Sequence, residues 1–230
     1  MGRLKANRAR IFRISDWNQV KKMKTDFCVI GGGIAGLSIA AELSKKASVV
    51  VLEREQDIAY HTSGRSAALY SELSAESTAL ALSKLAKPFL LSPPEGFSQY
   101  PLHIPITCIF TAKKDELEHI QSNAAKLENP VTLDIDQMLE QMPILRTGGD
   151  GIIAGLVEED AFRIDVGALV QGFRAMVKHN GGAVQCNAEV TSLTKNSDGW
   201  KAQLANGESV NSKYVVNAAG SWGDVIATLA

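Results

Sequence analysis

The chain has 230 residues, 45% of them hydrophobic, and its 24 Lys and Arg against 25 Asp and Glu give a formal net charge of -1. This length suits one sizeable domain, or a domain with a smaller lobe. The near-neutral charge argues against a dedicated nucleic-acid binder, and no apolar stretch is long enough to span a bilayer. Cys28, Cys108 and Cys186 lie far apart and suit neither a disulfide framework nor a metal site. We expect a cytoplasmic protein without a metal ion.

The first 22 residues form a basic leader, with seven Lys or Arg and a single acid, Asp16. The leader lacks the apolar core of a secretory signal, although its charge would also suit a mitochondrial presequence. Met23 stands just before the first expected strand and could be the true start. We expect residues 1–22 to be disordered or to lie outside the folded domain.

A strand–turn–helix–strand unit follows the leader. The apolar run Asp26–Ile30 ends at a glycine-rich turn, residues 37–43 have apolar side chains at helical spacing, and Val49–Leu52 reads as a second buried strand. The turn carries a G-x-G-x-x-G pattern, and an acid follows its first glycine by 22 residues. This context predicts a dinucleotide-binding unit of the Rossmann type.

Each position of the turn has a physical role in such a unit. Gly31 permits the tight turn, Gly33 lets the backbone approach a pyrophosphate, and Gly36 lets the helix pack closely against the strand. The first-turn N–H groups, at Ile34 and Ala35, would face the phosphates with the positive end of the helix dipole.

The acid at the end of the second strand indicates which dinucleotide fits. Glu53 can accept hydrogen bonds from both hydroxyls of an adenosine ribose and would repel a 2′-phosphate, which disfavours NADP. Arg54 tempers that repulsion slightly. The alternative is a glycine-rich turn without a ligand, but the strands, the helix and the acid all stand where a dinucleotide site requires them.

The segment Tyr60–Tyr70 is dense in small residues and hydroxyls. Together with the preceding unit it resembles the D-amino-acid oxidase-like (DAO) family of FAD-dependent oxidoreductases, and its motif is nearest to the D-arginine dehydrogenases. The resemblance implies FAD rather than NAD, on a glutathione-reductase-like Rossmann fold with a β-meander. The residues of this segment that it implies at the cofactor are Thr62, Ser63, Gly64, Arg65, Ser66, Ala67 and Ala68.

Later segments extend the resemblance over most of residues 24–230. A helix is expected from Val166 to His179, with Asp165 as its N-cap and a stop at Gly181. Strands over 184–190, 199–204 and 208–210 predict the meander, and a further buried strand is expected over 214–217. By resemblance, the backbone at Val190 contacts the adenine end, and Ala219 and Gly220 approach the cofactor closely.

The division expected from these elements has four parts. Residues 1–22 are the leader, 23–92 and 156–230 form the FAD-binding domain, and 93–155 are part of an α+β substrate lobe. In the lobe we expect a strand over 104–110 and helices near 115–127 and 136–142.

The resemblance implies oxidation of a C–N bond, in a D-amino acid or a secondary amine, by hydride transfer to flavin N5. No catalytic base is identifiable, and His61 is interpreted as a hydrogen-bonding or packing group rather than a participant in the chemistry. Leu69 and Ser74 replace polar residues that D-arginine dehydrogenases carry, which makes a strongly basic substrate doubtful.

Family members continue well beyond the strand that ends near Gly220. The alternative function is therefore a catalytically incomplete dinucleotide-binding fragment, and a C-terminal half supplied in trans is a possible partner.

Overall fold

The computed structural model describes residues 24–73, 77–125 and 130–230. The basic leader 1–22 and Ser74 lie outside the described residues. Contacts divide the chain into two compact units. The described residues of unit 1 are 24–66, 95–100 and 166–230, and those of unit 2 are 67–73, 77–94, 101–125 and 130–165.

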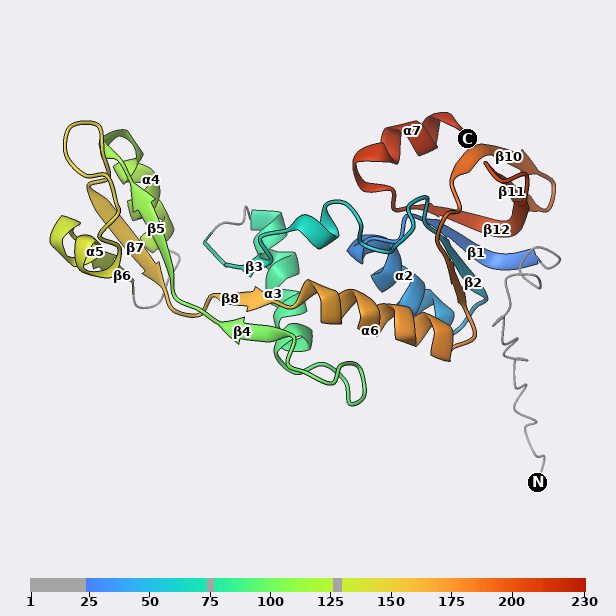
Figure 1. The fold of residues 1–230 in the computed structure, drawn as a ribbon, viewed down its shortest axis with the longest axis horizontal. Helices are drawn as coiled ribbons and strands as arrows, with labels where there is room; N and C mark the ends of the chain where they lie inside the picture. Colours follow the sequence, from blue (N-terminus) through green and yellow to red (C-terminus); the bar gives the residue numbers. More distant parts are fainter. Residues whose placement is uncertain (1–23, 74–76, 126–129) are drawn as a thin grey trace, which may run out of the picture. The chain divides into compact units, whose positions relative to one another are not determined.

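Unit 1 is built on a six-stranded sheet with the order β10-β11-β12-β1-β2-β9 (Figure 1). Its strands are β1 (Lys24–Ile30), β2 (Val49–Leu52), β9 (Ala183–Gln185), β10 (Val190–Asn196), β11 (Gly199–Leu204) and β12 (Ser209–Asn217). Strands β12, β1, β2 and β9 pair in parallel, and β10, β11 and β12 pair antiparallel. The helical elements are α2 (Ile34–Ser44), η1 (Ser63–Arg65), α6 (Val166–His179), η3 (Gly220–Trp222) and α7 (Gly223–Thr228).

Strand β2 and residues 27–30 of β1 are apolar because both faces of the sheet are covered there. Val29 and Val51 pack in one core cluster with residues of α2 and α6. Cys28 and Val50 pack in a second cluster with meander residues and with Ile226 of α7. The alternation along each strand thus assigns successive side chains to two different cores. The parallel pairing of β12, β1, β2 and β9 brings the carboxyl ends of these strands to one edge of the sheet.

The meander is present, but its first strand is not the expected segment 184–190. Val184 instead pairs in parallel with Val51, so that β9 forms an edge of the sheet. Asn187, with a φ of 53°, then turns the chain back, and the first meander strand is β10. The strand expected over 214–217 is the continuation of the third meander strand, β12.

Unit 2 contains two small sheets of antiparallel pairs. The orders are β3-β8-β4 and β5-β7-β6. The strands are β3 (Leu69–Tyr70), β4 (His103–Pro105), β5 (Cys108–Ala112), β6 (Val131–Leu133), β7 (Ala154–Glu158) and β8 (Phe162–Ile164), and the helical elements are α3 (Ser77–Leu91), η2 (Lys114–Glu116), α4 (Leu117–Ala124) and α5 (Ile135–Gln141). The segment expected as one strand over 104–110 is split between β4 and β5, in different sheets.

The unit boundaries differ from those expected at 93 and 155. Residues 69–70 pair with β8, which ties the chain from Ala67 onward to unit 2. Conversely, Phe97 packs on the helix α6 of unit 1, with its ring centroid 5.1 Å from that of Phe173. Long-range pairing and packing of this kind leave no signal in local composition. None of the described helices is long and apolar enough to cross a membrane.

Candidate dinucleotide site

The glycine-rich turn is held by close backbone contacts on both sides. Gly31 has a φ of 112°, and a Cβ built there would lie 2.3 Å from the carbonyl oxygen of Ala218, at the end of β12. A Cβ on Gly36 would lie 1.9 Å from the carbonyl oxygen of Gly31. Side chains at these two positions would force apart the end of β1, the start of α2 and the end of β12.

The first turn of α2 opens into a cavity of unit 1. Gly33 is the N-cap and supplies no side-chain cap, while the Ile34 N–H donates to Ser63 Oγ at 3.0 Å. Gly33, Ile34, Ala35 and Ser63 all line the cavity. The Ile34 N–H, expected to face the phosphates, is thus engaged by Ser63. The first-turn N–H groups that follow it have no intrahelical acceptor, so this end of α2 still offers donors and a positive dipole end to an anion.

Glu53 brings a carboxylate to the same cavity from the end of β2. Its side chain accepts hydrogen bonds from the Gly32 N–H, at 2.7 Å on Oε2, and from the Glu55 N–H, at 3.0 Å on Oε1. Glu53 is 9% exposed, and these bonds compensate the burial of its charge. Each oxygen keeps further acceptor capacity, so the carboxylate can both hold the turn and receive a hydroxyl.

The cavity has a volume of about 490 Å³, and every residue that lines it belongs to unit 1. That volume lies within the usual range for small-molecule sites, about 300–1,000 Å³. The sequence-predicted residues that line it are Gly31, Gly33, Ile34, Ala35, Glu53, Arg54, Thr62, Ser63, Val190, Ala219 and Gly220.

Six predicted residues do not line this cavity: Gly36, Gly64, Arg65, Ser66, Ala67 and Ala68. Gly64 shapes the loop instead, since a Cβ there would lie 2.2 Å from the carbonyl oxygen of Ala59. Ala68 belongs to unit 2, where its carbonyl oxygen accepts from the Ile164 N–H at 2.7 Å.

Sequence reasoning missed further lining residues, which are Ile30, Leu52, Ala59, Tyr60, His61, Ala188, Glu189, Ala218, Ser221, Trp222, Val225 and Ile226. Strand-end residues such as Ile30 and Leu52 were predictable from their neighbours in the motif. Trp222 and Ile226 carried no such signal, because only the turn after β12 brings them to the cavity.

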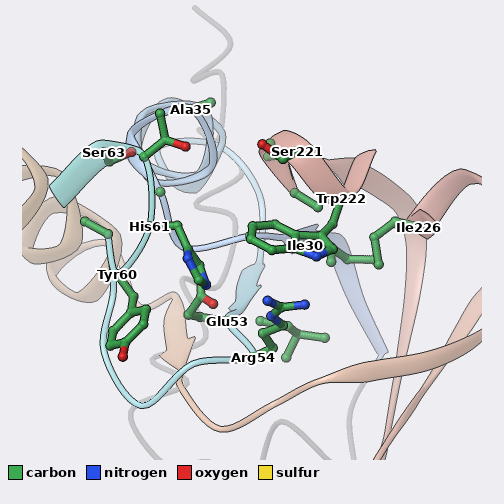
Figure 2. A pocket seen from close by; sticks show the side chains of 18 of the residues that line it. Ile30, Ala35, Glu53, Arg54, Tyr60, His61, Ser63, Ser221, Trp222 and Ile226 are labelled. Atoms are coloured by element: carbon green, nitrogen blue, oxygen red, sulfur yellow. The ribbon is translucent and has the colours of Figure 1, made fainter. Parts of the chain in front are cut away.

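An aromatic and charged cluster stands in the cavity, where Figure 2 shows Arg54, His61 and Trp222 pointing toward one another. The Arg54 guanidinium carbon lies 4.0 Å from the centroid of the Trp222 ring, and the His61 ring centroid lies 4.6 Å from it. Glu55 Oε1 accepts from Arg54 Nε at 2.9 Å and lies 2.8 Å from His61 Nε2. The contacts to His61, and then to Arg54, lower the pKa of Glu55. These contacts of His61 fit its interpretation as a hydrogen-bonding or packing group.

Comparison with known protein families shows to which family the chain belongs. The sequence model of the FAD dependent oxidoreductases (DAO) matches residues 26–230. The chain belongs to this family. The resemblance and the mixed α/β fold with a parallel sheet that we predicted from the motifs are confirmed, and so is FAD as the family's cofactor.

Two relatives show what this DAO chain is similar to. It is 26% identical over 218 residues to the glycerol 3-phosphate oxidase of Mycoplasma pneumoniae, covering 89% of this chain and 56% of that protein. The reduced L-alpha-glycerophosphate oxidase of the same organism, with FAD bound, superposes with a TM-score of 0.75 at 24% identity, over 90% of this chain and 57% of that one.

A third similarity is to the glycine oxidase of Geobacillus kaustophilus, with a TM-score of 0.75 and 18% identity over 90% of this chain and 58% of that one. At such identities the superpositions establish the fold alone. The chain thus spans somewhat more than half of the length of the relatives that it matches.

Proposed function

We propose that the cavity of unit 1 binds the ADP half of FAD. The observation that carries this proposal is that the open end of α2 and the buried carboxylate of Glu53 line one cavity. A pyrophosphate needs donors and a positive dipole, and a ribose diol needs a fixed acceptor. Both features line the same cavity, as the binding of an adenosine diphosphate would require.

The remaining walls of the cavity suit the rest of this ligand. Apolar residues at strand ends, among them Ile30, Leu52 and Val190, offer a surface for a planar base. Gly33 carries no side chain between the cavity and α2, and Ser63 holds the loop 60–65 against the start of the helix through the Ile34 N–H. In this proposal Thr62, Ala219 and Gly220 give close backbone approach to the phosphates.

We further propose that the chain is the FAD-binding part of an oxidoreductase that oxidises the C–N bond of a D-amino acid or a secondary amine. A bound flavin supplies the hydride acceptor of such a reaction. The protein's contribution within the described residues is to bind and orient the cofactor. The DAO family match supports the oxidoreductase class, while the choice of a C–N substrate rests on the resemblance of the sequence motifs.

Two alternatives have observations of their own. The match to glycerol 3-phosphate oxidase favours a phosphorylated alcohol as the substrate. The coverage of only 56–58% of the relatives favours a dinucleotide-binding fragment that is catalytically incomplete, or one completed by a C-terminal half in trans.

The first experiment is a visible absorption spectrum of the purified protein before and after addition of FAD, followed by desalting. Retained flavin absorbance supports the cofactor proposal, and a protein that stays colourless contradicts it. Reduced NADP, followed by its near-ultraviolet absorbance, serves as the control ligand, because Glu53 should exclude its 2′-phosphate.

Dye-coupled assays with D-amino acids, N-methylated amines and glycerol 3-phosphate then separate the substrate proposals. Turnover of glycerol 3-phosphate alone would contradict the C–N proposal. Retained flavin without any turnover would leave the fragment alternative, and addition of the C-terminal half of a family member would test completion in trans.

A further inference from the structure

Glu55 does not line the cavity, yet it contacts two side chains that do. Its Oε1 atom lies 2.9 Å from Arg54 Nε and 2.8 Å from His61 Nε2. The Glu55 side chain is 25% exposed. Its Oε1 atom holds both the Arg54 guanidinium and the His61 imidazole at the edge of the site. Charge-assisted bonds of this kind have narrow geometry.

The two side chains that Glu55 fixes meet on Trp222. Arg54 lies over the indole at 4.0 Å in a cation–π contact, and the His61 ring, tilted by 50°, packs against it at 4.6 Å. Trp222 ends η3, directly after the turn at Gly220, and its ring forms part of the cavity wall (Figure 2).

The cluster joins three segments that approach the cavity independently. Arg54 follows β2, His61 stands in the loop before η1, and Trp222 follows β12. The contacts through Glu55 and the indole tie their side chains together. Since Arg54 directly follows Glu53, the wall formed by Trp222 stands at the adenosine end of the proposed site.

We propose that Glu55 is a positioning residue for cofactor binding, which holds Arg54 and His61 against Trp222 so that the indole forms a preorganised wall for the adenosine end. The inference rests on the proposed binding of FAD. A wall that is already ordered loses little side-chain freedom when the ligand binds. Replacing Glu55 removes this advantage and should weaken binding.

The test uses the full chain with Trp222 as the single tryptophan, made by Trp17→Phe and Trp200→Phe. In this background Glu55→Ala removes both contacts, and Glu55→Gln keeps an acceptor without the charge. Glu42→Ala is the matched control, because Glu42 also binds a neighbouring cation, Lys45, at 2.7 Å but lies on the exposed surface of α2. Far-UV circular dichroism verifies that each variant is folded.

The first readout is Trp222 emission without ligand. Glu55→Ala should shift it to longer wavelength and increase quenching by acrylamide, Glu55→Gln should do so less, and Glu42→Ala should not change it. The second readout is calorimetric affinity for FAD and for ADP. Glu55→Ala should weaken both by the same factor, about three- to tenfold.

Two outcomes overturn the proposal while FAD binding stands: unchanged emission in Glu55→Ala, or changed emission with unchanged affinity. A larger loss for FAD than for ADP would also overturn it, since the wall would then not act at the adenosine end. If the unsubstituted chain binds neither ligand, the proposed function fails together with the positioning role. The ligand-free emission would then report only whether Glu55 holds the cluster.

Discussion

Replacing Gly36 by Ala tests whether the close contact of α2 with the glycine-rich turn holds the dinucleotide site together. The added Cβ would lie 1.9 Å from the carbonyl oxygen of Gly31, a backbone atom that cannot rotate away. Relief to an ordinary contact distance requires α2 to retreat by roughly 1.5 Å. Overpacking of this kind typically costs about 1–3 kcal/mol, and the rigid backbone neighbour places this case at about 3 kcal/mol.

The assay has two parts, thermal unfolding and FAD titration. A loss of about 3 kcal/mol corresponds to a fall in Tm of roughly 6–12 °C for a chain of this size. The retreat would also carry the first-turn N–H groups away from the cavity, so FAD affinity should fall in the same variant. Gly223→Ala is the matched control, because Gly223 also stands at a helix start but a Cβ there meets nothing within 4 Å.

The reasoning is refuted if Gly36→Ala unfolds at the same temperature as Gly223→Ala and binds FAD equally well. A variant that loses stability yet keeps full affinity for FAD would support the packing contact of α2. It would contradict the role of α2 in presenting donors to the ligand.

Three further predictions use other features of unit 1. Glu53→Gln removes a charged acceptor worth about 1.5–3 kcal/mol, so FAD affinity should fall roughly 10- to 150-fold by calorimetry, and an unchanged affinity would exclude the ribose contact. The hydrogen bond from Lys213 lowers the pKa of Asp26 from 3.8 to about 2. The contribution of ionised Asp26 to the free energy of unfolding should therefore be present above pH 4 and be lost as the pH falls toward 2. Because the pair is exposed, Asp26→Asn should reduce the change in the free energy of unfolding between pH 4 and pH 2 by at most about 1 kcal/mol. Identical pH profiles for the variant and the unsubstituted chain would refute this role of Asp26. Burial raises the pKa of Cys28 to about 12, so a thiol reagent at neutral pH should modify it only after unfolding, whereas rapid labelling of Cys28 in the folded chain would contradict its burial.

The sequence predicted those parts of the site that lie close together along the chain. The G-x-G-x-x-G turn, the helix predicted over 37–43 and the acid at Glu53 follow one another between Gly31 and Glu53, and local patterns identify each of them. The helix stop at Gly181 was equally local, since a φ of 85° requires a residue such as glycine.

The meander was predicted in kind but not in position. Strand character is present in both 184–190 and 190–196. The parallel pairing of Val184 with Val51 makes the start of the segment 184–190 an edge strand of the main sheet. Pairing partners come from distant parts of the chain, so no local pattern can select between such registers.

The sequence by itself determined the family, the parallel βαβ core and the two chemical requirements of the site, a helix start free of side chains and a carboxylate at a strand end. Tertiary structure alone decided how the cavity is walled. It brought Trp222, which follows β12, against Arg54 at the end of β2, and it assigned Ala67 and Ala68 to unit 2. The physical reason is that motif residues act through backbone geometry fixed within a few bonds, whereas a wall is built from side chains that meet only after the sheet has ordered its strands.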